Sequence, residues 1–268
     1  MNAVSIGPLV FDGARFAAIV GLLLFFVVVE IMARLQKSDA ARWAGIAVLA
    51  WIVVARMGFV AANRPAFAAH PLDALKLWQG GFMPAAGWAG GGGVLLVALL
   101  RKARCAVLPL ALGGAVAMAA HLAVTTALTR PPVTLPEEKL IALDGRGVQL
   151  AGRHRPVVLN LWATWCSPCR REMPMMTDLA ARTPGVDFVF ANQGEDAAQV
   201  VAFLQAEDLP AEGMIRDPRN RLMAELDAIG LPATLVFDAK GRMVAAHTGE
   251  ISRAALTRMI AQATGDPE

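Results

Sequence analysis

Two cysteines stand two residues apart in the segment WCSPC, as Cys166 and Cys169. The preceding run, residues 156–163, is apolar and typical of a buried strand, whereas the residues from Ser167 onward are typical of a helix. The unpaired N–H groups and dipole of a helix start stabilise a thiolate and lower its pKa. We therefore expect Cys166 to be the attacking sulfur and Cys169, one turn along, to release the mixed disulfide. Pro168 removes a backbone donor and stiffens the short loop.

Two polar residues flank this dithiol. Asn160 lies on the expected strand before the motif, and its amide cannot accept a proton. Glu172 follows Cys169 by three residues, nearly one helical turn, so its carboxyl can approach the pair and act as a general acid or base. Arg170 and Arg171 either offset that negative charge and contact acidic partners or form a solvated helix face, and the sequence leaves both open.

Other uses of a dithiol are less consistent with the sequence. A structural zinc site needs two more ligands, and His154 and His247 are single residues without metal spacing. Copper(I) held by the two thiolates stays open as a secondary property, whereas a structural disulfide across two residues constrains too little chain. We expect no metal and no cofactor beyond the redox-active disulfide Cys166–Cys169. Three neighbouring methionines are expected to pack in the core, namely Met173, Met175 and Met176.

The chain divides into two halves of different composition. Its 268 residues are 56% hydrophobic, with a mean hydropathy of +0.49, which is too apolar for one soluble domain. We expect a transmembrane domain over residues 1–130, a Pro-rich linker over residues 131–136, and an α/β domain over residues 137–268. The net charge of +3 is not accompanied by an aromatic-basic stripe, so no nucleic acid is expected as a partner.

The first half contains four apolar segments long enough to cross a bilayer, at residues 16–33, 44–62, 82–100 and 106–128. No small-residue cleavage site follows the first, so it is expected to remain as a span. The loops after the first and third spans are short and basic; they carry Arg34, Lys37, Arg42, Arg101, Lys102 and Arg104. The positive-inside rule places both in the cytoplasm. We expect a multi-pass protein of the bacterial inner membrane, embedded in the lipid bilayer, with a periplasmic carboxy-terminal domain.

Three further features of the first half bear on function. His70 falls in an external loop, and His121 falls within the fourth expected span, where it is either a hydrogen-bonding residue between helices or a functional group. The segment GWAGGGG, residues 87–93, lies in an apolar run and favours close helix packing over phosphate binding.

In the second half, strands alternate with helices and the order ends in an antiparallel pair. The expected elements are a hairpin at residues 139–150, strands at 156–163, 186–193, 212–215, 233–238 and 241–249, and helices at 167–181, 195–209, 219–229 and 252–264. The first helix is expected to be interrupted at Pro174. This order predicts a mixed α/β sandwich.

This order, with WCSPC at the first strand-to-helix junction, resembles thioredoxin. It is more closely similar to the membrane-tethered ResA/TlpA/DsbE-type thiol-disulfide oxidoreductases of bacteria, over residues 133–265. The run NLWATWCSPCRREMP, the insertion at residues 195–215 and the segment GLPATLVFD carry the resemblance. Thioredoxins keep a buried carboxylate where this chain has Asn160, and Glu172 matches a carboxylate that the narrower family places near its thiols.

The resemblance implies a thioredoxin fold, protein-disulfide reductase activity and several roles around the dithiol. Pro232 is implied to be cis and to face the disulfide, exposing the backbone of Leu231 to pair with a client chain as an added strand. Trp165 is expected to contact the client beside them, and Pro174 is implied to kink the active-site helix.

The first hundred residues or so resemble another family. SIGPL at residues 5–9 and the run at residues 55–81 are similar to the amino-terminal part of prolipoprotein diacylglyceryl transferase. The Arg-Trp-Tyr-Gly of that family is replaced here by residues 12–15 (DGAR), and a histidine of its His-Gly-Gly stretch aligns with Ala85. Because these groups are missing, we expect the transferase activity to be lost and the region to serve as an anchor or docking surface.

The cysteine count bears on the source of electrons. The first half has one cysteine, Cys105, so it cannot pass a dithiol pair across the bilayer, and a separate membrane dithiol reductant must supply electrons. The expected partners are periplasmic client proteins with cysteines, such as apocytochrome c, other thiol proteins or copper-site proteins. Two alternatives stay open: a transferase-related membrane protein with a regulatory thioredoxin domain, and a copper(I)-binding oxidase assembly factor.

Overall fold

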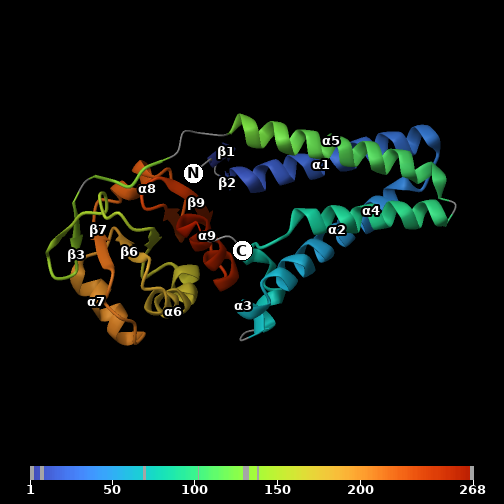
Figure 1. Ribbon diagram of the computed structural model, residues 1–268. Coiled ribbons are helices and arrows are strands. Elements are labelled where there is room, and N and C mark those ends of the chain that lie inside the picture. Colours follow the sequence, from blue (N-terminus) through green and yellow to red (C-terminus); the bar gives the residue numbers. More distant parts are fainter. Residues whose placement is uncertain are drawn as a thin grey trace. The chain divides into compact units, whose positions relative to one another are not determined.

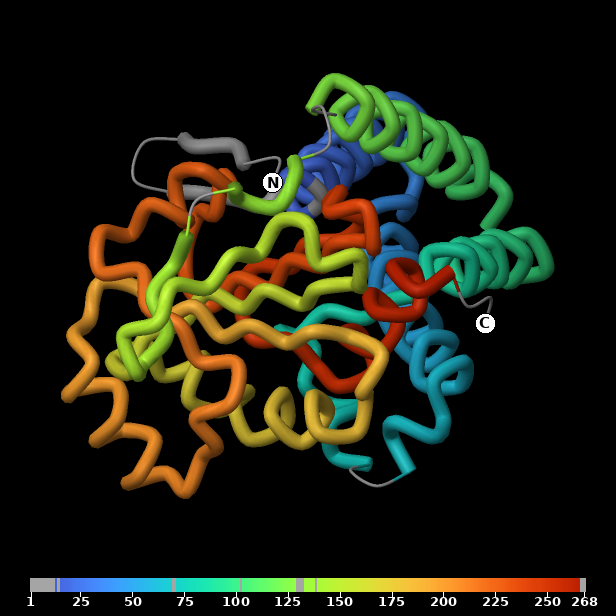
Figure 2. The backbone as a smooth tube through the Cα atoms, turned by 60° about the vertical axis from the view of Figure 1, so that its left-hand side comes forward, coloured from blue at the N-terminus to red at the C-terminus, as the bar shows by residue number. Residues whose placement is uncertain are grey.

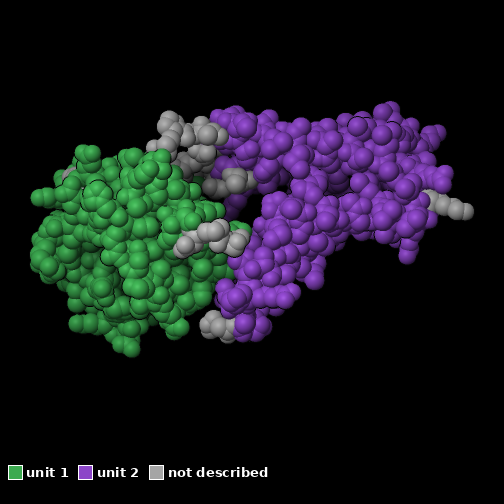
Figure 3. Space-filling view, viewed as in Figure 1, with its two compact units in different colours: residues 1, 78–80, 130–268 green, residues 2–77, 81–129 purple. Residues whose placement is uncertain are grey.

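The computed structural model describes residues 3–6, 9–68, 71–101, 103–128, 133–137 and 139–265. The chain forms two compact units (Figure 3). The helical unit contains Asn2–Leu77 and Gly81–Thr129, and the α/β unit joins residue 1 and Trp78–Gly80 to Arg130–Glu268. Some residues considered above lie outside the described ranges, namely His70, Lys102 and the first two linker residues, 131–132.

The helical unit is built mainly from two pairs of long helices. Helix α1 (Gly13–Gln36) packs against α5 (Arg104–Ala127), and α2 (Ala40–Ala62) packs against α4 (Pro84–Leu100), as Figure 1 shows. Shorter elements complete the unit: a hairpin of β1 (Ala3–Ile6) and β2 (Leu9–Asp12), helix α3 (Arg64–Ala68) and the 3-10 turn Pro71–Leu75. A second 3-10 turn, Leu77–Gln79, begins at the last residue of this stretch of the helical unit, and its other two residues are assigned to the α/β unit. The amino-terminal hairpin was not expected from the sequence.

Three of the long helices are long and apolar enough to cross a membrane, namely α1, α2 and α5. Helix α4 has 17 residues, which gives a length of about 25 Å against a hydrocarbon core of about 30 Å. It begins at Pro84 because proline suits the first turn of a helix, and Gly81 before it has a φ of +80°. The expected count of four spans is therefore not confirmed: among the described residues of the helical unit, three helices are candidates and α4 is a shorter apolar helix.

Glycines in the segment at residues 87–93 allow α2 and α4 to approach closely. A Cβ atom on Gly87 would lie 2.6 Å from Cε2 of Trp51, and one on Gly90 would lie 2.9 Å from the carbonyl oxygen of Ala50. A larger residue at either position would require the helices to move apart. This confirms the interpretation of the segment as a packing surface.

One cation of the helical unit is buried within it. Arg56 on α2 donates hydrogen bonds to the carbonyl oxygens of Asp73 (2.8 Å), Ala74 (2.9 Å) and Gly81 (2.9 Å). Its guanidinium also lies within 6 Å of three ring centroids, those of Phe59, Phe67 and Phe82. Arg56 thus ties the connection between α3 and α4 to the middle of the unit.

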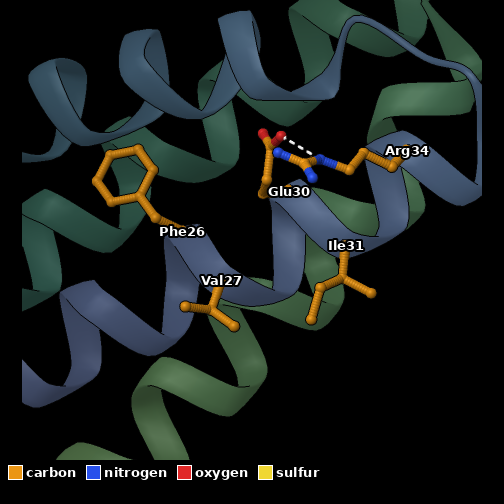
Figure 4. Close-up of a pocket in the computed structure, with 5 residues that line it drawn as sticks. All are labelled: Phe26, Val27, Glu30, Ile31 and Arg34. Carbon is orange, nitrogen blue, oxygen red and sulfur yellow. Dashed lines mark hydrogen bonds and ion pairs between the residues drawn. The ribbon is translucent and has the colours of Figure 1, made fainter.

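Two residues of opposite charge form a pair on the surface of α1. Glu30 and Arg34 point toward each other along the helix and form an ion pair of 2.7 Å (Figure 4). They line a shallow recess of about 470 Å³ together with Phe26, Val27 and Ile31. Their spacing of four residues brings them to the same helix face.

The α/β unit contains a sheet in the order β4-β3-β7-β6-β5-β8-β9. Strand β5 pairs in parallel with β6, and β6 with β7, while β8 and β9 run antiparallel on the other side. The strands are β3 (Leu140–Ala142), β4 (Gly147–Val148), β5 (Val157–Trp162), β6 (Asp187–Gln193), β7 (Met214–Asp217), β8 (Ala233–Phe237) and β9 (Met243–Thr248). All strands and the hairpin expected in the second half are present.

Alternation along β5 sends side chains into two cores. Val158, Asn160 and Trp162 face one core, which also contains residues of α6 (Ser167–Arg182), α7 (Ala197–Ala206) and α9 (Arg253–Thr264). Leu159 and Leu161 face the other core, which α8 (Arg221–Glu225) helps to cover. Met173 and Met176 are fully buried in the first core, as expected. Figure 2 draws the backbone of these strands and helices as a tube.

Three helices of the α/β unit differ from the sequence expectation. Helix α7 covers Ala197–Ala206 rather than residues 195–209. Helix α8 has five residues rather than the eleven expected, because the residues around it, Asn220 and Asp227, have φ values of +54° and +52° and leave the helical conformation. Helix α6 continues through Pro174, so the expected interruption is wrong. The Thr177 hydroxyl donates to the carbonyl oxygens of Met173 and Pro174 at this turn. Whether Pro174 kinks α6 stays a prediction.

The end of the expected linker pairs with the sheet edge. The backbone N–H of Leu135 donates to the carbonyl of Gly241 (2.9 Å), and that of Met243 donates to the carbonyl of Val133 (2.8 Å). The Leu135 side chain is buried in the second core. Residues 133–135 therefore contribute to the edge beside β9.

Candidate active site

The two cysteines of WCSPC form a disulfide at the start of α6. Their Cα atoms are 5.3 Å apart, and Cys166 is the N-cap residue of the helix. The Cys166 sulfur accepts a hydrogen bond from the backbone N–H of Cys169 at 3.3 Å, and Pro168 stands in the first turn. Cys166 is 4% exposed and Cys169 is fully buried. The sulfur of Cys166 thus lies where helix N–H groups favour a thiolate.

The residue before the disulfide is far more exposed to solvent than the two cysteines. Trp165 is 70% exposed, although the loop that carries it leads directly into a buried helix start. A large aromatic side chain left in solvent beside a reactive group is a ready contact for another protein.

The segment before β8 lies at the same sheet edge as the disulfide. Strand β8 runs antiparallel to β5, with Ala233 opposite Leu161, so Leu231 and Pro232 lie next to the carboxyl end of β5. The Leu231–Pro232 peptide bond is cis, as the resemblance implies. The Pro232 carbonyl accepts a hydrogen bond from Gly249, and Leu231 packs against the core that includes Cys166.

Glu172 lies on the buried face of α6, and its carboxyl group contacts strand β5 of the sheet. Its Oε1 accepts a hydrogen bond from Nδ2 of Asn160 (2.9 Å), and its Oε2 accepts one from the backbone N–H of Ile251 (3.0 Å). The pKa of Glu172 is raised to about 8, chiefly by burial and also by the nearby carboxylate of Glu250, against the opposing effect of the two hydrogen bonds and the charge of Arg171. Asn160 and Glu172, singled out by the sequence, are therefore direct partners.

The two arginines after Cys169 pair with carboxylates of the same unit. Arg171 Nη2 lies 2.7 Å from a carboxylate oxygen of Glu250, and Arg170 forms an ion pair with Glu207. Both arginines remain about half exposed, and the Arg170 guanidinium also lies 5.4 Å from the ring centroid of Phe203. Arg170 therefore lies on a solvated helix face, where an exposed ion pair contributes little to stability. Arg171 pairs with the buried carboxylate of Glu250, and its charge lowers the pKa of Glu172.

Sequence reasoning missed a buried carboxylate that holds the loop before Cys166. Glu195 Oε2 accepts hydrogen bonds from the backbone N–H of Thr164 (2.8 Å) and from Nδ2 of Asn192 (2.6 Å), and Oε1 accepts one from the Thr164 hydroxyl. Glu195 is buried. The carboxyl ends of parallel strands meet at one sheet edge, so polar residues after β5 and β6 were a usable signal.

Thr234 was missed as well. It lies directly opposite Asn160 in the β5–β8 register, and its hydroxyl oxygen accepts a hydrogen bond from Asn160 Nδ2 at 3.1 Å. Both side chains are fully buried. A threonine two residues after a proline carries little signal by itself, because its partner becomes evident only when the strands are paired.

With this geometry in view, the chain can be compared with known proteins. The sequence model of the Redoxin family matches residues 128–262, which is half of the chain. The chain belongs to the redoxin family. It is 37% identical over 98 residues to the thiol:disulfide interchange protein DsbE homolog of Paracoccus denitrificans, covering 36% of this chain and 52% of that protein. It therefore spans about half the length of this relative.

One further relative and one solved structure are also similar to parts of the chain. The chain is 32% identical over 123 residues to the thiol-disulfide oxidoreductase ResA of Geobacillus thermodenitrificans, covering 45% of this chain and 70% of that protein. The solved structure of MTB DsbF covers 49% of this chain and all of that one, with 26% identity and a TM-score of 0.44. The redoxin member described here is a thiol-disulfide oxidoreductase of the DsbE/ResA family, with Cys166 and Cys169 as its Cys-X-X-Cys pair.

Proposed function

We propose that this redoxin is a membrane-tethered, periplasmic protein-disulfide reductase. The observation that carries the proposal is the Cys166–Cys169 pair at the start of α6, where the Cys166 sulfur accepts the N–H of Cys169. A thiolate at this position gains the same hydrogen bond and the helix dipole, which favours Cys166 as the nucleophile. Cys169 is fully buried and reacts second.

The reaction consists of two exchange steps. The thiolate of Cys166 attacks one sulfur of a client disulfide, a new S–S bond to the client forms, and the second client sulfur leaves and takes up a proton. Cys169 then loses its proton and attacks Cys166, and the first client sulfur leaves as a thiol. The client gains two electrons and two protons, and the Cys166–Cys169 disulfide remains to be reduced by a dithiol donor.

Glu172 is proposed to accept the proton of Cys169 in the second step. It lies on the same buried face of α6, three residues after Cys169. Because its pKa is raised to about 8, it is close to the ordinary thiol value of about 8.5, and proton transfer between the two groups is nearly balanced. Asn160, Pro168 and Pro174 shape the surroundings of this site.

Client binding is proposed to use the surface around the disulfide. Trp165 offers an exposed aromatic face, and the backbone of Leu231 before Pro232 offers hydrogen-bonding groups to an extended client segment. A strand added at this position would bring a client cysteine to Cys166 through main-chain contacts. Such contacts tolerate several client sequences, in keeping with a reductase of more than one protein.

The helical unit is proposed to be a four-span anchor derived from a diacylglyceryl transferase-like region. In this arrangement α4 is the third span, extended by residues on either side, and the α/β unit lies in the periplasm. The basic residues around the junction of α1 and α2 support this orientation, namely Arg34 near the end of α1, Lys37 between the helices and Arg42 near the start of α2. The unit contributes one thiol, Cys105, so a separate membrane protein is proposed to supply the dithiol.

The proposed clients are periplasmic proteins that need paired, reduced cysteines, such as apocytochrome c. The test is the reduction of a protein disulfide by the full-length protein in detergent, with a chemical dithiol as donor. Cys166→Ser is expected to abolish turnover, whereas the matched variant Cys105→Ser is expected to keep it. Unchanged turnover in Cys166→Ser would refute the proposal.

Identifying the client and the direction of transfer requires a second experiment. Replacing Cys169 by Ala stops the reaction after the first step and is expected to trap the client on Cys166 as a mixed disulfide. Recovery of a periplasmic cysteine protein, released by reductant, supports the proposal. Covalent partners confined to the cytoplasm would contradict the proposed orientation.

A further inference from the structure

A small polar group lies in the first core directly behind the disulfide. It consists of Asn160 on β5, Glu172 on α6 and Thr234 on β8. The Asn160 Nδ2 atom is 2.9 Å from Glu172 Oε1 and 3.1 Å from Thr234 Oγ1. All three residues are buried, with at most 2% of each exposed. The only polar partners that such groups can use are their neighbours, so donors and acceptors must match.

The observed arrangement matches an ionised Glu172. Its two oxygens face two donors, the Asn160 amide and the backbone N–H of Ile251, and a carboxylate accepts from both. Both N–H groups of Asn160 are used in this arrangement. The carbonyl oxygen Oδ1 of Asn160 is buried and has no partner among the described residues. A buried acceptor without a partner destabilises the folded state.

The protonated form of Glu172 does not match this arrangement. A proton on Oε1 would point at the N–H of Asn160, so that two donors would face each other. Burial raises the pKa of Glu172 to about 8, so the protonated form is the main one at neutral pH. It needs an acceptor within reach, and the unpaired Oδ1 atom of Asn160 belongs to the residue already in contact.

We propose that the Asn160 side-chain amide turns by half a turn when Glu172 gains its proton. Oδ1 then accepts hydrogen bonds from the Glu172 carboxyl and from the Thr234 hydroxyl, which changes from acceptor to donor. When Glu172 loses its proton, the amide returns and Nδ2 donates to both. Asparagine carries a donor and an acceptor of nearly equal size, and a hydroxyl does both, so the exchange needs no change in packing. In the turned state Nδ2 takes the place of the unpaired Oδ1, so the amide N–H groups then lack a partner among the described residues.

This makes Asn160 a positioning residue that serves both proton states of Glu172. The inference rests on the proposed role of Glu172 as the proton acceptor of Cys169. A fixed donor at position 160 would stabilise only the carboxylate, whereas a turning amide stabilises the group before and after proton transfer. Aspartate, the usual buried acid of thioredoxins at this position, would itself compete for the proton.

Other charged groups face Glu172 and must be distinguished from it. Glu250, after β9, contributes a carboxylate that is paired with Arg171 of α6. His247 on β9 lies with its Nε2 atom 3.2 Å from the Glu250 carbonyl oxygen, and Cys169 lies on the same helix as Glu172. In the oxidised protein Cys166 and Cys169 form the disulfide, so neither of them titrates. A Glu172→Gln variant keeps Glu250, Arg171 and His247 and removes only the proton switch.

The test is nuclear magnetic resonance on the full-length oxidised protein in detergent micelles, between pH 6 and pH 10. The chain contains five asparagines, so selective labelling of asparagine amides and threonine methyl groups gives few signals. Asn160→Asp and Thr234→Ser assign the two signals needed. The readout is the nuclear Overhauser effect between the Asn160 amide protons and the Thr234 methyl group, beside the Glu172 carboxyl shift.

The expected result is a several-fold weaker Overhauser effect at pH 6 than at pH 10, with the same midpoint as the Glu172 carboxyl. In Glu172→Gln the effect is expected to be independent of pH. An effect of constant strength while the carboxyl titrates would overturn the proposal, and so would a carboxyl that does not titrate in this range. Neither result bears on whether Cys166 reduces clients, which the turnover assay decides separately.

Discussion

Two buried carboxylates border the dithiol, and they are surrounded differently. Glu195 contacts the loop before Cys166 and accepts three hydrogen bonds, two of them from Thr164 and one from Asn192. Glu172 follows the dithiol, accepts two, and has the carboxylate of Glu250 nearby. Glu195 accepts hydrogen bonds from the loop before Cys166 and from β6, which suits a side chain that fixes this loop. Glu172 has a pKa raised to about 8, which suits a group that exchanges a proton.

The difference shows that burial alone does not define a catalytic acid. Both carboxyl groups are almost completely removed from solvent. The number of donors and the charges of the neighbours decide whether a buried acid stays ionised or changes state near neutral pH. The following predictions test this distinction, beginning with the largest expected effect.

Glu172→Gln is expected to lower the rate of disulfide exchange above pH 8, where Glu172 is mainly ionised, by about 100-fold, because an amide cannot accept the proton of Cys169. The pH dependence of the rate that arises from a group near pH 8 should disappear. Turnover of a protein disulfide by the full-length protein between pH 6 and pH 10 measures both. A wild-type pH profile in Glu172→Gln would remove the distinction between the two carboxylates.

The same substitution has a consequence for stability. The folded pKa of Glu172 is about 8, above its ordinary value of 4.5, so the folded state keeps a proton that the unfolded state releases above pH 4.5. The free energy of unfolding of the wild type therefore falls as pH rises from about 4.5 to about 8, by up to ~1.4 kcal/mol per pH unit. The free energy of unfolding of Glu172→Gln should therefore increase relative to that of the wild type as the pH rises through this range.

Pulse proteolysis of the full-length protein in urea at pH 5 and pH 8 measures this difference. The contributions of Glu250 and His247 are common to both proteins and cancel in the comparison. Equal stability differences at the two pH values would mean that Glu172 is ionised in the folded protein throughout.

Glu195→Gln is expected to reduce the free energy of unfolding by about 1–3 kcal/mol, because the new amide group presents donors to the donors of Thr164 and Asn192. The exchange rate should fall by less than about tenfold, through a looser loop before Cys166, and its pH dependence should stay that of the wild type. If the pH profile changes as in Glu172→Gln, the two carboxylates share one function.

Trp165→Ala is expected to have the smallest effect. The side chain is 70% exposed and holds no part of the core, so the stability should be nearly unchanged. The KM for a protein disulfide should rise several-fold with kcat unchanged, because the side chain supplies binding area to the client. A small-molecule disulfide serves as the control, and a parallel loss with that substrate would place Trp165 in the chemistry instead.

The sequence was sufficient for the parts of the site that follow from local patterning. The position of Cys166 as N-cap, the location of Glu172 on the same helix and the strand carrying Asn160 all follow from one strand, one turn and one helix. The short α8 did not follow, because its ends depend on positive φ values at Asn220 and Asp227, which apolar periodicity does not encode.

Contacts between distant segments were the harder part. The hydrogen bonds of Glu195 and Thr234 join strands that are far apart in sequence, so they become apparent only once the register is known. The length of α4 was overestimated because an apolar run does not show where its helix begins, and here Pro84 sets the start. A hydropathy average gives the apolar residues before Pro84 the same weight as those of the helix, although they are not helical.

The central claim is that the Cys166–Cys169 pair delivers electrons to client disulfides. The most direct measurement is its reduction potential, obtained by equilibrating the full-length protein in detergent with redox buffers. The account predicts a value close to that of thioredoxins, about −270 mV. A value near that of strongly oxidising disulfide donors, about −120 mV, would contradict it and make the protein a source of disulfides.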